Sequence, residues 1–159
     1  MEITFLPIGT ICSPFTEISG MPIQPAGAAG IQGTIRLLPQ YVEGLRDLIG
    51  FSHITLLYQF HRSQEVNLTI IPFLDSKPHG IFATRAPKRP NPIGLSVVRL
   101  LSIKGDILNI ENVDILDGTP LLDIKPYVPE FDHQSDVRVG WLENAKGQSR
   151  IKLSDDRFS

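Results

Sequence analysis

The stretch from Phe82 to Ser96 contains the residues of this sequence best suited to bind an anion. It reads FATRAPKRPNPIGLS, with three prolines between residues 87 and 92. Because proline fixes φ and lacks a backbone N–H, the stretch is predicted to be a stiff loop between strands. Such a loop would hold Arg85, Lys88 and Arg89 in place with little entropy loss on binding, and arginines can pair with a carboxylate or phosphate. The alternative is a rigid solvated turn.

A second stretch, residues 114–129, is acidic and contains the sequence Asp117-Gly118-Thr119-Pro120. Asp-Gly is a turn signal, and a residue before proline is driven into an extended conformation. A tight turn of this kind exposes backbone N–H and C=O groups to a ligand, and Asp117 could accept hydrogen bonds from an amine or from ribose hydroxyls. The simpler interpretation is a turn with no ligand.

Other signals of chemistry are weaker. Residues 21–30 form a loop of small residues that a ligand could approach closely, and His61-Arg62 follows a predicted strand. The four histidines lack the H-x-x-x-H and H-x-E spacings, so no catalytic zinc is expected. The sequence has no G-x-S-x-G motif, and no G-x-G-x-x-G follows a strand, so a hydrolase elbow and a doubly wound nucleotide fold are not expected.

The charges are unevenly distributed along the chain, although 15 Lys+Arg and 17 Asp+Glu nearly balance. Residues 76–105 contain six cations and no acid, whereas residues 106–136 contain eight acids and one lysine. Neighbouring strands of opposite charge would explain this pattern. A basic face that binds an anionic partner would explain it equally well.

Short runs rich in β-branched residues, separated by turns, predict the elements that position these groups. Thirteen prolines and thirteen glycines punctuate the chain. The predicted strands are Ile3–Ile11, Ile31–Leu38, His53–Phe60, Asn67–Phe73, Gly94–Ile103, Asp106–Val113 and Leu121–Val128, with a tight hairpin turn at Gly105. Only Pro39–Ile49 has helical periodicity. The fold class is therefore mostly β: a single-domain barrel or sandwich over residues 1–145 with one short helix, followed by a tail or edge strand over 146–159.

Composition limits the cellular setting. The 159 residues are 42% hydrophobic and include one cysteine. No secretory signal or membrane-spanning run is visible, and a lone thiol forms no internal disulfide, so a cytoplasmic location is expected.

The motif Phe82–Ser96, followed by LDGTPLLDIKPY over residues 116–127, resembles the TsaA-like (TrmO) family of S-adenosylmethionine-dependent tRNA methyltransferases. The resemblance spans roughly Ile3 to Leu142. It implies a β-barrel unlike the usual methyltransferase folds, a homodimer, and N6-methylation of threonylcarbamoyladenosine beside the anticodon of certain tRNAs.

The resemblance also implies a set of cofactor-binding residues. These are Pro22, Ile23, Gln24, His61, Arg62, Arg85, Leu95, Asp117, Gly118, Thr119 and Pro120. At Ile23 bacterial members commonly carry an arginine. A backbone contact to the cofactor would survive this change, whereas a salt bridge to the methionine carboxylate would not. Bacterial members also commonly carry a further C-terminal domain, which this chain is too short to include.

Methyl transfer to nitrogen requires alignment of the nucleophile with the methyl group, and a nearby base helps to remove the proton. Asp117 and His61 are the candidate bases. Arg85, at the end of an apolar strand Ile81–Ala83, is expected to face the cofactor. Lys88, Arg89 and Asn91 are expected at the outer tip of the loop, in contact with tRNA. The competing interpretations are a non-catalytic S-adenosylmethionine-binding module and a plain RNA-binding barrel.

Overall fold

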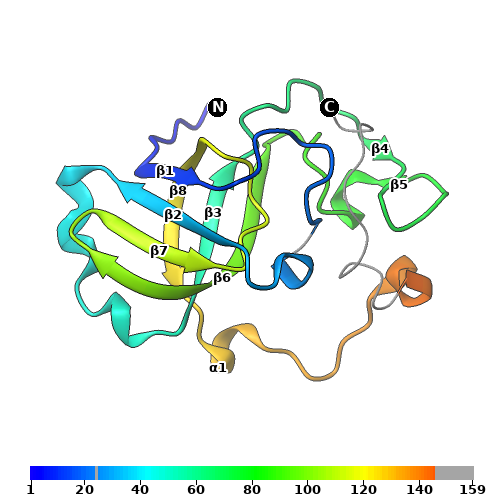
Figure 1. Ribbon diagram of the computed structural model, residues 1–159. Coiled ribbons are helices and arrows are strands. Elements are labelled where there is room, and N and C mark those ends of the chain that lie inside the picture. Colours follow the sequence, from blue (N-terminus) through cyan, green and yellow to red (C-terminus); the bar gives the residue numbers. More distant parts are fainter. Residues whose placement is uncertain (24, 146–159) are drawn as a thin grey trace.

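Six antiparallel strands close into a barrel in the computed structural model, which describes residues 1–23 and 25–145 (Figure 1). The strands are β1 (Gly9–Cys12), β2 (Gln32–Leu37), β3 (His53–Gln59), β6 (Ile93–Lys104), β7 (Ile107–Glu111) and β8 (Thr119–Pro126). Their order around the barrel is β1-β2-β7-β6-β3-β8, and β8 pairs with β1 to complete the ring. Closure pairs both edges of the sheet, so no strand edge is left open. The fold confirms the predicted mostly-β barrel.

The barrel interior is filled by aliphatic side chains, because each strand alternates inward and outward residues. In β3, for example, Ile54, Leu56 and Tyr58 are buried while the residues between them are partly exposed. The core includes Ile11, Ile35, Leu37, Ile54, Leu56, Tyr58, Val98, Leu100, Leu108, Ile110, Val113, Ile115 and Leu121. The predicted hairpin is also present: Gly105 adopts a positive φ of 63° between β6 and β7, a conformation that glycine adopts readily.

Two predicted strands are shorter than expected. The first begins at Gly9 rather than Ile3, and the run from Asn67 contributes only β4 (Thr69–Ile70), which pairs with β5 (His79–Gly80) outside the barrel. The apolar segment Ile81–Ala83 is not a strand but a 3₁₀ helix, η4. Its last turn is closed by Thr84, which donates from its backbone N and from Oγ1 to the carbonyl of Ile81.

The single helix predicted over Pro39–Ile49 is wrong. The segment forms two 3₁₀ helices, η2 (Pro39–Leu45) and η3 (Leu48–Gly50). Asp47 separates them with a φ of 68°, a left-handed conformation that ends regular helical hydrogen bonding. Of the apolar side chains behind this prediction, Leu45 and Leu48 pack against the barrel core, whereas Tyr41 and Ile49 are exposed.

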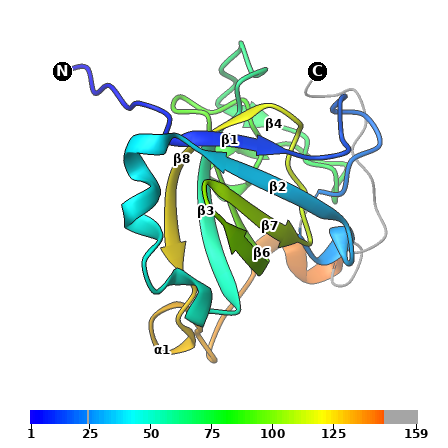
Figure 2. The same ribbon diagram turned by 60° about the vertical axis from the view of Figure 1, so that its left-hand side comes forward.

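Long connections, one of which carries β4 and β5, extend from one side of the barrel (Figure 2). They include η1 (Pro25–Ala28) and the loop from residue 60 to residue 92. After α1 (Pro129–Asp132) the chain runs to η5 (Gly140–Ala145), which lies near β4 and β5 in Figure 1. The predicted tail, 146–159, lies outside the described residues. No described helix has the length and apolar character needed to cross a membrane.

Candidate functional site

A cavity of about 960 Å³ lies where β3 and β6 meet the long connections. This volume is within the range of small-molecule sites. Six segments far apart in the sequence contribute to its lining: the loop before β2, residues 58–63 at the end of β3, residues 72–74, residues 82–95, residues 114–119, and η5 with Val139 just before it. The cavity therefore has a barrel wall built on paired strands and a loop wall built on connections.

The barrel wall carries a chain of hydroxyl and carboxyl groups. Ser96 Oγ on β6 donates to Asp114 Oδ1 over 2.7 Å, and Tyr58 Oη on β3 lies 2.9 Å from the same Oγ. Since the single hydroxyl proton of Ser96 points to the carboxylate, Tyr58 donates to Ser96. Tyr58, Gly94 and Asp114 all line the cavity. Gly94 has no side chain, and a Cβ added there would clash with the Tyr58 ring.

Burial alters the acidity of this chain of groups. Burial raises the pKa of the Asp114 carboxyl to about 6, although the Ser96 hydrogen bond and the Arg85 charge act in the opposite direction. Burial, followed by the Asp114 charge, also raises the pKa of the Tyr58 hydroxyl far above its ordinary value. Asp114 is half-buried, so part of it remains accessible from the cavity.

The loop wall is held by Arg89 rather than by paired strands. Its Nη1 donates to the carbonyls of Ile81, Thr84 and Ala86 at 3.1, 2.7 and 3.4 Å. Its guanidinium carbon also lies 5.9 Å from the centroid of the Phe82 ring. Phe82 is 76% exposed and lines the cavity. Its ring therefore lies at the rim of the cavity, next to the Arg89 guanidinium.

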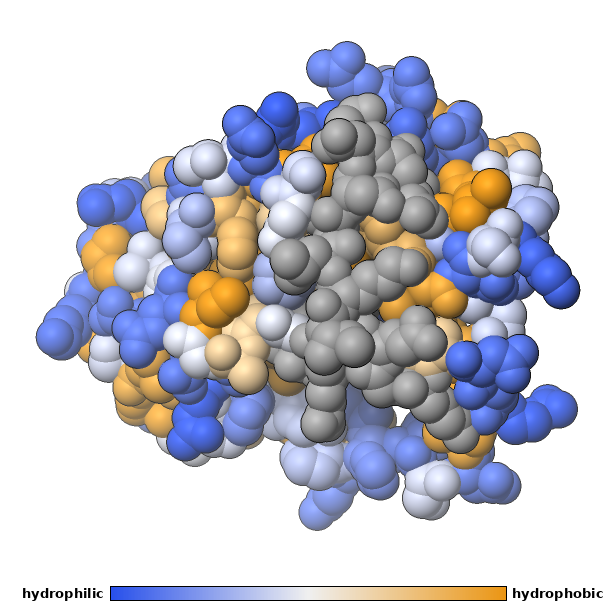
Figure 3. All heavy atoms as spheres, turned by 45° about the vertical axis from the view of Figure 1, so that its right-hand side comes forward, coloured by the Kyte–Doolittle hydropathy of each residue, from blue (hydrophilic) through white to orange (hydrophobic). Residues whose placement is uncertain are grey.

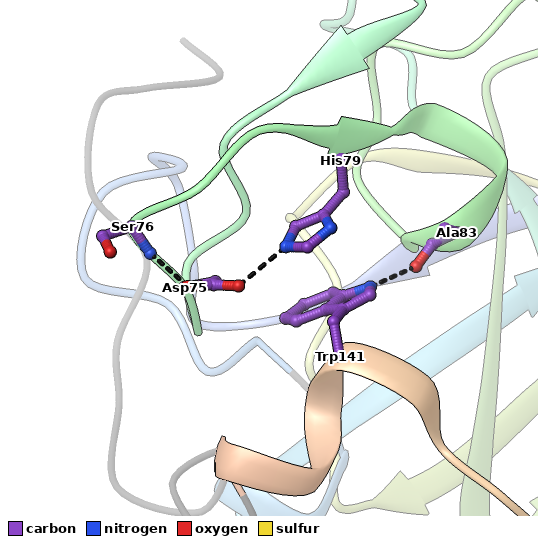
Figure 4. Close-up of polar contacts among 5 residues, drawn as sticks. All are labelled: Asp75, Ser76, His79, Ala83 and Trp141. Atoms are coloured by element: carbon purple, nitrogen blue, oxygen red, sulfur yellow. Dashed lines mark hydrogen bonds and ion pairs between the residues drawn. The ribbon is translucent and has the colours of Figure 1, made fainter.

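Trp141 on η5 lines another part of the cavity, and Figure 4 shows its contacts with neighbouring residues. Its Nε1 donates to the carbonyl of Ala83 over 2.8 Å, and its ring stacks on His79 with centroids 4.6 Å apart. His79 Nε2 in turn lies 2.7 Å from Asp75 Oδ2. One aromatic side chain thus links η5 to both η4 and the β4–β5 hairpin.

The cavity brings together most of the predicted cofactor residues. Those that line it are Pro22, Ile23, His61, Arg62, Arg85, Leu95 and Thr119. Asp117, Gly118 and Pro120 do not line it, and Gln24 lies outside the described residues. Arg85 reaches the cavity as expected, although a 3₁₀ helix rather than a strand precedes it.

Asp117 has a structural task in its turn. Its Oδ1 accepts from the backbone N of Ser13 over 2.9 Å, while its own N donates to the carbonyl of Phe15 over 2.7 Å. These bonds tie the Asp-Gly turn to the end of β1, and Gly118 there adopts a φ of 80°. The turn thereby fixes the start of β8, where Thr119 is buried and lines the cavity.

The predicted tRNA-contacting cations turn inward. Lys88 Nζ lies 3.1 Å from Glu65 Oε2, with the lysine side chain only 12% exposed, and Arg89 is bound to backbone carbonyls. The expectation that both extend from the loop tip is therefore wrong geometrically. The bonds from Arg89 to the carbonyls of the loop therefore help its prolines to hold the loop in shape. Asn91 is exposed and lies outside the cavity lining.

His61, the other predicted base, lines the cavity next to Arg62. Partial burial, and to a lesser degree the Arg62 charge, lowers the pKa of the His61 imidazole. The imidazole is therefore neutral at pH 7 and able to accept a proton. The described residues hold no group of three or more His, Cys, Asp or Glu side chains that could bind a metal ion.

Sequence reasoning missed Asp114, Tyr58 and Phe82 as cavity residues. One signal pointed to the first two: Ser96 occupies an inward position of an alternating strand, between Gly94 and Val98. A buried hydroxyl needs a partner, and the partners here are 18 and 38 residues away. No local pattern identifies them.

The side of the molecule that carries the loops presents apolar and polar groups together (Figure 3). Apolar side chains, in orange, form several separate groups, and hydrophilic side chains in blue surround them. Such a mixture suits a ligand with an apolar ring system and charged ends.

Comparison with known proteins identifies the family. The tRNA-methyltransferase O N-terminal domain family matches residues 10–133. A probable S-adenosyl-L-methionine-binding protein of Pyrococcus abyssi is 54% identical over 99% of this chain and 86% of its own length. The tRNA (adenine(37)-N6)-methyltransferase of Escherichia coli is 35% identical over 89% of this chain and 64% of its own.

Solved structures agree. The crystal structure of TrmO from Pseudomonas aeruginosa superposes with a TM-score of 0.75 at 43% identity, covering 89% of this chain and 63% of that one. This chain therefore spans just under two thirds of the E. coli enzyme and of the solved TrmO chain. On sequence and fold alike, the chain belongs to the tRNA-methyltransferase O N-terminal domain family.

Proposed function

We propose that this protein transfers the methyl group of S-adenosylmethionine to N6 of adenine 37 in tRNA. The observation that carries the proposal is the cavity: seven residues expected to contact the cofactor line one space, together with a carboxylate and a rim aromatic. The named relatives support both the cofactor and the reaction.

The cavity suits the chemistry of the cofactor. S-adenosylmethionine has an adenine ring, ribose hydroxyls, an ammonium, a carboxylate and a sulfonium. Apolar residues such as Met21, Leu95 and Leu116 offer surfaces for the ring, and Arg85 offers a guanidinium for the carboxylate. Because Ile23 cannot form a salt bridge, the carboxylate depends more heavily on Arg85 in this chain.

The rim suits a nucleobase. An adenine methylated at N6 must leave its stack and enter the site. The exposed ring of Phe82, held beneath the Arg89 guanidinium, offers a stacking surface at the mouth of the cavity. Base–aromatic stacking contributes about 1–3 kcal/mol per base, enough to stabilise an extruded base.

For the finer substrate we propose N6-threonylcarbamoyladenosine. Its threonyl carboxylate would add an anion near the reacting nitrogen, and Arg62 at the edge of the cavity is exposed enough to bind it, with one hydrogen bond of 3.3 Å to the carbonyl of Thr16. Lys88 and Arg89 would then act on tRNA by holding the loop in shape, and Asn91 remains a proposed direct contact.

The test is methyl transfer from labelled S-adenosylmethionine to two tRNAs that differ only in threonylcarbamoylation at adenine 37. We expect label at N6 of the modified tRNA and little on the unmodified one. Equal labelling of both would contradict the finer substrate but not the reaction. Cofactor binding without transfer to either tRNA would support a non-catalytic S-adenosylmethionine-binding module instead.

We also propose a homodimer. The segment before β1 exposes Ile3, Phe5 and Leu6 by 64% or more, an apolar surface that the described part of this chain does not cover. Burying it against a second copy would remove it from water. Light scattering at micromolar concentration should give twice the chain mass, and the change Phe5→Ser should shift the mass toward one chain. A monomeric mass for the unaltered protein would refute the dimer.

A further inference from the structure

Asp114 is the only carboxylate among the described residues that line the cavity. The other charged or titratable groups there are Tyr58, His61, Arg62, Arg85 and Arg89. We propose that Asp114 is the general base that removes the N6 proton during methyl transfer. This inference rests on the proposed function and assigns a role that sequence reasoning gave to Asp117 or His61.

Three segments hold the carboxylate in place. Ser96 on β6 donates to Oδ1, Tyr58 on β3 orients Ser96, and Arg85 from the loop contributes a positive charge. Both hydroxyls sit on strands paired in register, with Leu57 opposite Leu95 and Tyr58 opposite Gly94. A general base must keep its geometry through the reaction, and two paired strands provide that rigidity.

The Asp114 carboxylate is held by Ser96 and also borders the cavity. Oδ1 accepts the Ser96 hydrogen bond, while Asp114 as a whole is half-buried and lines the cavity. A substrate in the cavity can therefore approach the acid directly.

The reaction needs such a group. The N6 lone pair of a carbamoylated adenine is delocalised into the carbonyl and the ring, so the nitrogen is a weak nucleophile while it keeps its proton. In the proposed step the N6–H bond breaks and the proton passes to Asp114, the N6–C bond forms, and the carbon–sulfur bond breaks. The bonding pair stays on sulfur, which changes from sulfonium to thioether, and a neutral carboxylic acid remains beside a neutral product.

The acidity of Asp114 suits this role. Burial raises the pKa of this carboxyl to about 6, so the group is ionised at pH 7 but is a stronger base than an exposed carboxylate. The Arg85 charge lowers the pKa of the Asp114 carboxyl, and the Asp114 charge in turn raises the pKa of the Tyr58 hydroxyl. His61 is the competing base in the same cavity.

The experiment compares single-turnover methyl transfer by the whole protein and by Asp114→Asn, at saturating cofactor and threonylcarbamoylated tRNA. Asparagine keeps the shape and still accepts from Ser96. We expect the rate to fall 10²- to 10⁴-fold while the dissociation constant for S-adenosylmethionine stays within threefold. Asp106→Asn, in the turn between β6 and β7 and outside the cavity lining, is the matched control and should keep the wild-type rate.

The pH profile separates a base from a structural group. The wild-type rate should rise with pH through about 6 and then level off. Since the Ser96 hydrogen bond lowers the pKa of Asp114, the variant Ser96→Ala should move this limb to higher pH, whereas His61→Gln should leave it in place. The pH profiles of Ser96→Ala and His61→Gln test the proposal even if Asp114→Asn does not fold.

Three results would overturn the inference while the proposed function stands. These are an active Asp114→Asn, a variant that loses cofactor affinity but not the saturated rate, and a limb that moves with His61→Gln rather than with Ser96→Ala. Absence of methyl transfer by the wild-type protein would instead refute the proposed function, and with it the role of Asp114 as a base.

Discussion

The two walls of the cavity are stabilised in different ways. The barrel wall belongs to a core of thirteen buried residues, every one of which lies in a strand or in the connection between β7 and β8. The loop wall has a separate buried cluster of only Ile70 and Ile81, with Phe73 and Ala86 packed against it. Polar contacts replace apolar burial there: Arg89 to three carbonyls, Trp141 to Ala83, and His79 to Asp75.

This difference in stabilisation implies a difference in how easily the two walls open. Apolar burial is nondirectional but collectively large, so the barrel can hold Tyr58, Ser96 and Asp114 in a fixed arrangement. A few directional hydrogen bonds cost less to open, so the loop wall can open locally at a lower cost in free energy. We expect alterations in the barrel to lower the free energy of global unfolding, and alterations in the loops to lower only that of local opening.

The largest effect is expected from Leu56→Ala in β3, whose side chain is fully buried. Removing it leaves a cavity in the core and should lower the free energy of unfolding by about 3 kcal/mol. Urea denaturation measures this. Leu57→Ala, at the neighbouring half-buried position, is the matched control and should cost less than half as much.

Gly94→Ala is expected to lower both the stability of the barrel wall and the activity of the site. An added Cβ would lie only 2.5 Å from Cζ of Tyr58 and would contact other atoms of its ring, so the ring must shift away from Ser96. Overpacking of this kind costs about 2 kcal/mol. Urea denaturation should show that loss and methyl transfer should fall as well, whereas Gly50→Ala, where nothing lies within 4 Å, should change neither. A stable but inactive variant would contradict the expected strain.

The barrel was predictable from the sequence because its signal is local and repeated. Alternation from Gly94 to Leu100 and the turn at Gly105 specify strand, face and connection within a few residues. The segment 39–49 failed because its apolar spacing fits both helix types, and the left-handed Asp47 leaves no trace in that spacing. The run from Asn67 is β-branched but finds only β5 as a partner.

The site was predictable only where residues act locally. The Asp-Gly signal correctly identified a turn, but it could not show that the Asp117 carboxylate bonds to Ser13, 104 residues away. Asp114 stands three positions earlier with no motif of its own, and its role comes from Ser96 and Tyr58 on other strands. Likewise, the charges of Lys88 and Arg89 predicted cations at a loop, but not that Glu65 and three carbonyls would bind them.

A smaller, local effect is expected from Arg89→Ala. Hydrogen bonds from a charged group contribute about 1.5–3 kcal/mol, and removing this one leaves the carbonyls of Ile81, Thr84 and Ala86 to find water. Hydrogen exchange of the Thr84 amide should accelerate about tenfold or more, while amides of β3 and β6 keep their protection. Arg99→Ala, at an exposed position of β6, should accelerate neither. Global loss of protection in Arg89→Ala would show that the two walls unfold together.

The smallest effect concerns the contact that joins η5 to the loop wall, and Trp141 reports it directly because it is the sole tryptophan. Hydrogen bonds from His79, and then from the Ser76 amide, lower the pKa of the Asp75 carboxyl below its ordinary value. The Asp75–His79 contact therefore contributes its full stabilisation at pH values above 3.8, the ordinary pKa of the carboxyl. This stabilisation is lost as the pH falls through the lowered pKa of Asp75 in the folded protein.

We expect quenching of Trp141 fluorescence by acrylamide to increase in acid as Asp75 takes up a proton, frees His79 and loosens the stack. Asp75→Asn should show the increased quenching already at pH 7 and little further change in acid, since the charge is gone at every pH. Asp47→Asn, in a left-handed position that asparagine tolerates and with no side-chain cap bond, is the control and should follow the wild-type curve. If Asp75→Asn also follows it, then the bond to Ala83 holds η5 alone, and the loop wall depends on backbone acceptors rather than on the ion pair.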